Sequence, residues 1–121
     1  MKKNNRFRVF EGKKANDRHI RLTEDMIVSE AWKDLKATSV KLYISLKLRY
    51  NGENYDSIEF PYSEAEKIGI SKNIIKTCFD DLIKCGFIEM ISCGRFSRTA
   101  NIYKLSNGWR EYKAVRGMVN I

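Results

Sequence analysis

The spacing of apolar residues between residues 63 and 88 predicts two short amphipathic helices with a glycine between them. Ser63 and Glu66 have the spacing of a capping box at the start of the first helix, and Gly69 is placed to end it in the left-handed conformation. Ser71 is the expected N-cap of the second helix. The predicted inward face of that helix consists of Ile75, Cys78, Phe79, Leu82 and Ile83. Two helices joined by a short turn that contains glycine are typical of a helix-turn-helix.

Helices and strands are also predicted on either side of these two helices. In chain order they are a short strand or extended lead-in over 20–28, a helix over 29–35, a longer helix over 37–50, a strand over 57–62, two strands over 87–92 and 99–106, and a helix from 108 onward. Ser29 is a suitable N-cap for the helix that follows it. Pro61 has no N–H to donate, so it should end the ladder of its strand.

The order of these elements predicts one domain of the α+β class with a winged helix-turn-helix fold. Its wing is a small antiparallel β-hairpin, in which the last two predicted strands are joined by a turn around Gly94. We expect a basic N-terminal arm over 1–19, the winged-helix domain over 20–107 and a C-terminal helix over 108–121.

The composition is that of a folded chain with a polar surface. At 121 residues, with 43% hydrophobic and 31% charged residues, the chain can bury one core. Its apolar runs stay well below the ~18 residues that a membrane-spanning helix needs. The basic N-terminus lacks the apolar stretch of a signal peptide. We therefore expect a cytoplasmic protein that does not bind a membrane.

Residues suited to catalysis or metal binding are few and scattered. The cysteines Cys78, Cys85 and Cys93 form no CxxC pair, and His19 is the sole histidine. The sequence contains no recognisable catalytic set, phosphate-binding loop or metal-ligand spacing. We therefore expect no enzymatic activity, no metal, no cofactor and no small-molecule substrate.

The positive charge of the chain indicates a negatively charged binding partner. The net charge is +8, and residues 1–18 hold seven lysines and arginines against Glu11 and Asp17, a net charge of +5. A basic arm on a compact domain is the electrostatic footprint of a protein that binds a polyanion.

The exposed face of the second predicted helix carries Lys72, Asn73, Lys76 and Thr77, with Ser71 at its start. Such side chains supply the donors and acceptors that base edges and phosphates require. Asn73 suits adenine, and Lys76 suits guanine or phosphate. We therefore expect double-stranded DNA as the partner, with the recognition helix over 71–85 in the major groove. The basic wing over 93–98, with Arg95 and Arg98, is expected on the DNA backbone.

Four short motifs resemble a known pattern, in which "S-x-A-W-x-x-L" leads to "L-Y-x-x-L", then to "I/L-G-I/L-S" in a helix-turn-helix, and then to "L-x-x-x-G-F-I". The matching residues are Ser29, Ala31, Trp32 and Leu35; Leu42, Tyr43 and Leu46; Ile68, Gly69, Ile70 and Ser71; and Leu82, Gly86, Phe87 and Ile88. Over residues 26–112 the chain thus resembles the winged-helix domains of replication initiators and regulators of Gram-positive plasmids, conjugative elements and phages. The resemblance implies a transcriptional or replication-control factor of a mobile element.

Alternatives to this interpretation remain open at several positions. Asp80 and Asp81 in the recognition helix favour a winged-helix module that binds a protein and not DNA. A C-terminal apolar stripe would support a homodimer or else pack against the helix that holds Tyr43; it consists of Trp109, Tyr112, Val115, Met118 and Val119. Four aromatic residues could stack on unpaired bases, although packing is the expected role; they are Tyr50, Tyr55, Tyr62 and Phe96.

Overall fold

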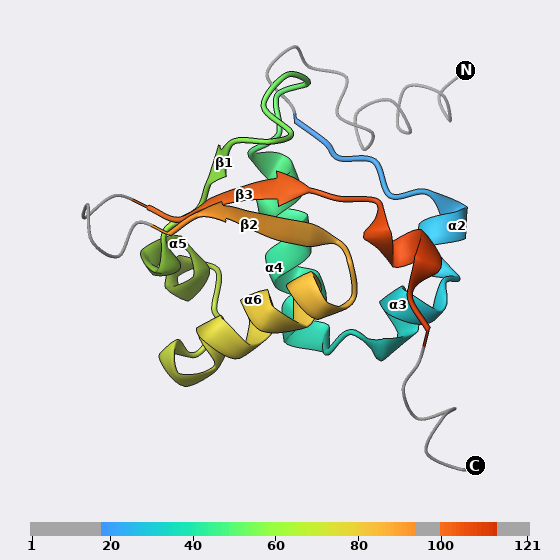
Figure 1. Cartoon of the computed structure of the whole chain (residues 1–121). Helices are drawn as coiled ribbons and strands as arrows, with labels where there is room; N and C mark the ends of the chain where they lie inside the picture. Colours follow the sequence, from blue (N-terminus) through green and yellow to red (C-terminus); the bar gives the residue numbers. More distant parts are fainter. Residues whose placement is uncertain (1–17, 94–99, 114–121) are drawn as a thin grey trace, which may run out of the picture.

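The computed structural model describes residues 18–93 and 100–113 and has an α+β fold, in which helices pack against a small antiparallel sheet (Figure 1). The elements, with η for a 3-10 helix, are α2 (Glu24–Ile27), α3 (Glu30–Asp34), α4 (Ala37–Leu48), β1 (Ile58–Glu59), α5 (Tyr62–Lys67), η1 (Lys72–Ile74), α6 (Ile75–Lys84), β2 (Ile88–Ser92), β3 (Ile102–Leu105) and η2 (Gly108–Glu111). The predicted α+β class is confirmed.

The sheet has three strands in the order β1-β3-β2, and both neighbouring pairs are antiparallel. Tyr103 in the central strand lies opposite Ile58 of β1 and Met90 of β2. A β-bulge follows between Met90 and Ser92, which locally bends β2. The three predicted strands are therefore present, with shorter bounds than the sequence suggested.

Helix α4 supplies one side of the core, where Leu42, Tyr43 and Leu46 are buried. It runs behind the sheet, and α6 packs across it (Figure 1). The Tyr43 ring lies 5.2 Å from the ring of Phe87, which also meets the ring of Trp32 edge-on at 5.8 Å between centroids. These aromatic contacts join α3, α4 and the segment after α6 into one core.

The start of α3 follows the sequence prediction. The Ser29 hydroxyl accepts a hydrogen bond from the Trp32 N–H at 3.2 Å, so Ser29 is the N-cap. The turn before it differs, because Glu24–Ile27 forms the helical turn α2 where a strand or extended chain was expected. Acidic residues in the first turn, here Glu24 and Asp25, favour a helix N-terminus, and the turn buries Met26.

Helix α5 begins one residue before its predicted cap. Its N-cap residue is Pro61, which has an extended backbone and no side chain that could cap the helix, and Ser63 lies within the first turn. The Glu64 N–H donates to the Pro61 carbonyl at 3.0 Å. The predicted capping box of Ser63 and Glu66 is therefore wrong.

Both α5 and α6 end at a glycine with positive φ, which is +96° at Gly69 and +87° at Gly86. In each case the glycine N–H and the next N–H donate back to carbonyls of the helix at 3.0 or 3.1 Å. This is the Schellman pattern of helix termination, in which glycine avoids the strain that a Cβ would cause. The predicted role of Gly69 is confirmed.

The predicted C-terminal helix does not start as an α-helix. Gly108–Glu111 is a 3-10 turn, and Tyr112 is extended. Trp109 is buried and stacks on Phe87 at 6.2 Å, while the Tyr112 hydroxyl donates to Asp34 at 2.8 Å. Through these contacts Trp109 and Tyr112 pack within the domain. A continuous α-helix over these residues would break the contacts. Residues 114–121 lie outside the described residues.

The boundary between the predicted arm and the domain falls near Arg18. Its guanidinium donates to the carbonyls of Leu48 and Tyr50 at 2.7 and 3.1 Å, at the end of α4. A cation at that place suits the negative end of a helix dipole. Residues 1–17 of the arm lie outside the described residues.

Candidate nucleic-acid interface

Helix α6 presents one face to the core and the opposite face to solvent. Ile75, Phe79 and Leu82 are at most 1% exposed. Lys76 and Thr77 are exposed on the other face, and η1 adds the exposed Lys72 and Asn73 just before it. The polar residues predicted to meet a ligand therefore lie together at the N-terminal end of α6.

The start of this segment is wound more tightly than predicted. The helix expected over 71–85 consists of the 3-10 turn η1 followed by α6. The Ile74 N–H donates to the Ser71 carbonyl at 3.0 Å, and within the described residues the Ser71 hydroxyl makes no capping bond. Ser71 is therefore the N-cap residue, as predicted, but it precedes the 3-10 turn η1 and its side chain does not cap the helix. Ser71 itself remains exposed beside Lys72.

Lys76 and Asp80 form an ion pair along the exposed face of α6. The distance from Lys76 Nζ to Asp80 Oδ2 is 2.8 Å, and the two side chains are 76% and 57% exposed. The hydrogen bond with Asp80 raises the pKa of Lys76 above its ordinary value, so the ammonium stays charged. An acceptor and a donor are thus presented to solvent side by side.

Asp81 is placed differently from its neighbour. Its carboxylate accepts a hydrogen bond at 3.0 Å from the backbone N–H of Lys36, the N-cap residue of α4. Lysine cannot cap a helix with its side chain, so an acid from α6 serves the start of α4 from a distance. Sequence reasoning missed this role because the two residues are far apart in the chain. Asp81 is therefore turned away from the exposed face that carries Lys76.

A further basic residue lies at the turn between α5 and η1. Gly69 is exposed in this turn, and a Cβ built on it would lie 3.0 Å from the Nζ of Lys41, which belongs to α4. The Lys41 ammonium therefore adds positive charge beside the start of η1. The spacing of residues along α4 cannot predict this placement of Lys41, because it depends on how α4 packs against the turn after α5.

Tyr62 lies against α6 in a stack of three aromatic rings. Its ring is nearly parallel to that of Phe79 at 5.3 Å, and Phe79 stacks on Tyr103 at 4.7 Å. Burial raises the pKa of Tyr62, although the residue remains 39% exposed. The expected packing role is thus seen for Tyr62 and for Tyr50, which is partly buried against the core. Tyr55 is 50% exposed, so its role stays a prediction, and Phe96 lies outside the described residues.

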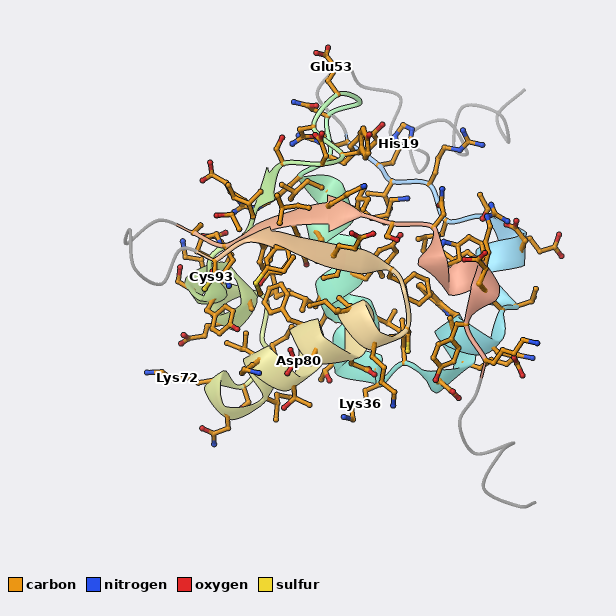
Figure 2. The ribbon with its side chains drawn as sticks, in the orientation of Figure 1. His19, Lys36, Glu53, Lys72, Asp80 and Cys93 are labelled. Carbon is orange, nitrogen blue, oxygen red and sulfur yellow. The ribbon has the colours of Figure 1, made fainter. Side chains whose placement is uncertain are left out.

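The β2–β3 hairpin ends on the side of the molecule where η1 begins. Figure 2 shows Lys72 and Cys93 on this side, with Cys93 exposed directly after β2, whereas Glu53 and His19 lie at the top of the view. The predicted wing residues Arg95 and Arg98 lie outside the described residues. The start of the hairpin loop and the polar end of η1–α6 therefore share one side.

The described residues contain little that suits a metal or a reaction. Among residues 18–93 and 100–113, no group of three or more His, Cys, Asp or Glu side chains could hold a metal ion. Cys78 and Cys85 are buried, and the Cys78 thiol donates to the Thr38 hydroxyl at 3.3 Å. The expectations of no metal, no cofactor and no catalysis stay predictions. In the same part of the chain, no helix is both long and apolar enough to cross a membrane.

Comparisons with known proteins do not assign this chain to a family. No family model matches the chain, and comparisons with curated proteins and with solved structures find no match either. The winged-helix resemblance drawn from the sequence therefore stays a prediction.

Proposed function

We propose that this chain is a winged-helix protein that binds double-stranded DNA in a sequence-specific manner. One observation carries the proposal: the exposed polar start of η1–α6 and the end of the β2–β3 hairpin project from the same side of the molecule (Figure 1). A helix presented by its N-terminal end can enter the major groove, and its first residues then reach the base edges.

The topology supports the winged-helix part of the proposal. The chain passes through α4, β1, α5, α6, β2 and β3 in that order, and β3 pairs with both other strands. The turn between α5 and η1 contains Gly69 in the left-handed conformation, and glycine is common in the turn of a helix-turn-helix. The hairpin after α6 then takes the place of the wing.

In this proposal the exposed residues divide into two groups. Asn73 reads adenine and Lys76 contacts guanine or phosphate, because both lie at the start of the recognition segment. Ser71, Lys72 and Thr77 hold the segment against phosphates and sugars. Two further arginines, Arg95 and Arg98, would reach the DNA backbone from the loop between β2 and β3, and the basic arm would add affinity that does not depend on sequence.

Binding of labelled random duplexes tests the proposal. We expect binding at low salt, with log affinity falling against log salt by a slope of about −0.9 for each phosphate neutralised. Selection from random duplexes should then enrich one short motif. Failure to bind any duplex at low salt, or binding without an enriched motif, would overturn the proposal. The genomic neighbourhood of the enriched motif would separate transcriptional from replication control of a mobile element.

A protein-interaction module is the second candidate. Two observations favour it: Asp80 on the exposed face of α6, and the apolar Met90 and Ile91 on β2, which are 42% and 53% exposed. Such a module would show no duplex binding, and a partner protein would be released by Met90→Asp and retained by Asn73→Ala. DNA binding is the better supported function because the residues that precede Asp80 on this face are basic or neutral.

A homodimer remains part of the proposal, but only the stripe residues beyond Lys113 are left to support it. Trp109 and Tyr112 pack within the domain, so they cannot form the predicted dimer stripe. Sedimentation of the full chain and of a chain ending at Lys113 would test the remaining stripe residues over 114–121. A dimer that becomes a monomer on truncation supports this role, and a monomer in both cases rejects it.

A further inference from the structure

Lys76 and Asp80 present a hydrogen-bond donor and an acceptor that form an ion pair with each other. Their charged atoms lie 2.8 Å apart, and both side chains are mostly exposed, so the pair is presented outward from α6. The neighbouring Asp81 is bound to the N–H of Lys36, which leaves Asp80 as the acid that projects on the face of Lys76. Asn73, three residues before Lys76, is exposed as well.

A carboxylate on a DNA-binding face has two opposing effects. It repels phosphates, and therefore lowers affinity for every sequence. It also accepts a hydrogen bond from the N4 amine of cytosine, whereas a lysine beside it donates to O6 and N7 of guanine. These base atoms lie next to each other in the major groove of a single G·C pair. A neighbouring ammonium and carboxylate can therefore contact the guanine and the cytosine of one G·C pair at the same time, and only in one orientation of that pair.

We propose that Lys76 and Asp80 together select one oriented G·C base pair within the DNA site, with Lys76 donating to the guanine and Asp80 accepting from the cytosine amine. This inference rests on the proposed function. Asp80 acts as a specificity-determining residue in two ways. It contributes a hydrogen bond at the correct pair, and its charge weakens binding wherever the cytosine amine is absent.

Selection from random duplexes with matched variants tests this inference. Asp80→Asn removes the charge and leaves a weaker acceptor, so it should weaken the G·C preference at one position and bind random duplexes more tightly, with the ratio of selected to random affinity reduced about fivefold or more. Glu53→Gln removes the same charge from a loop at the top of Figure 2, away from α6, and should leave the motif unchanged. The double variant Lys76→Asp with Asp80→Lys keeps the ion pair and the net charge, and it should invert the selected pair from G·C to C·G.

The outcomes separate the inference from the function on which it rests. A wild-type chain without duplex binding would overturn both. A wild-type chain that enriches a motif, while Asp80→Asn and the double variant enrich the same motif, would overturn the inference alone. Both variants change exposed side chains, so far-UV circular dichroism should match the wild type and confirm that selectivity and not folding has changed.

Discussion

The two ends of α6 have different surroundings. Its N-terminal end follows the exposed Lys72 and Asn73, whereas the residues after its C-terminal end are hydrogen-bonded to η2. Beyond Cys85, which is 1% exposed, the Trp109 N–H donates to the Gly86 carbonyl at 3.0 Å. The N-terminal end of α6 (the open end) is thus exposed to solvent, and the C-terminal end (the closed end) is packed in the core. The difference predicts that changes at the closed end act on stability, while changes at the open end act on binding.

Gly86→Ala should have the largest effect, because it breaks the closed end. A Cβ at this residue would overlap the backbone of Gly108 and Trp109, and the φ of +87° disfavours any other residue. Strain of this backbone together with overpacking should lower the free energy of unfolding by about 2–5 kcal/mol. Urea denaturation of the purified variant measures the loss.

Gly52→Ala is the matched control for that measurement. Gly52 has a similar φ of +98°, but an added Cβ there would meet no atom within 4 Å among the described residues. Only the backbone term should remain, about 1–2 kcal/mol. Equal losses for the two variants would contradict the claim that η2 closes this end of α6 by direct packing.

Alkaline unfolding should also distinguish the two regions. Burial raises the pKa of Tyr43, which packs on Phe87 at the closed end, and that of Tyr103, each to about 12. A raised pKa means that stability is complete below the ordinary value near 10 and falls between pH 10 and 12. The loss approaches about 2–3 kcal/mol for each tyrosine above that range. Denaturation at several pH values should show this decline.

Two tyrosine variants assign the alkaline decline to its source. Tyr43→Phe should reduce it, because the ring stays in the core and the ionisable group is removed. Tyr62→Phe should change it less, because Tyr62 is 39% exposed and its phenolate can be hydrated. An unchanged decline in Tyr43→Phe would mean that the pKa of Tyr43 in the folded protein lies close to its value in the unfolded chain.

The parts of the fold that were predicted correctly depend on short-range patterns. Apolar spacing located the buried face of α6, and positive φ at Gly69 followed from its place after a helix. The Ser29 cap was also local, since it needs only the residues of the first turn. In each case the physical cause lies within a few residues of its effect.

The features that sequence reasoning missed depend on residues far apart in the chain. The bond from the Lys36 N–H to Asp81 and the position of Lys41 over the turn exist only once α4 and the later helices pack together. Trp109 and Tyr112 fitted a helical stripe by spacing, but contacts with Phe87 and Asp34 hold them in a different conformation. Tertiary packing overrode a weak local preference there.

Asn73→Ala should affect binding while leaving the fold unchanged, which tests the open end of α6. Asn73 is exposed, so the free energy of unfolding should stay near that of the wild type. If it reads a base edge, affinity for the selected duplex should fall by about 1–3 kcal/mol, and preference at one base pair should relax. Fluorescence anisotropy with selected and mismatched duplexes measures both effects. An equal loss for every duplex would assign Asn73 to the DNA backbone.

The smallest expected effect is the difference between the adjacent acids Asp80 and Asp81. It tests whether two neighbouring residues that lie on different sides of α6 act differently. Asp81→Ala removes the acceptor of the Lys36 N–H and a negative charge at the start of α4, which should cost about 1 kcal/mol. Asp80→Ala removes an exposed partner of Lys76 and should leave the urea midpoint close to that of the wild type. In duplex binding the order should reverse, because Asp80 lies on the exposed face and Asp81 does not. Equal effects of both variants on stability would show that the bond between α6 and the start of α4 contributes little, and that the open and closed sides of α6 are less distinct than their contacts indicate.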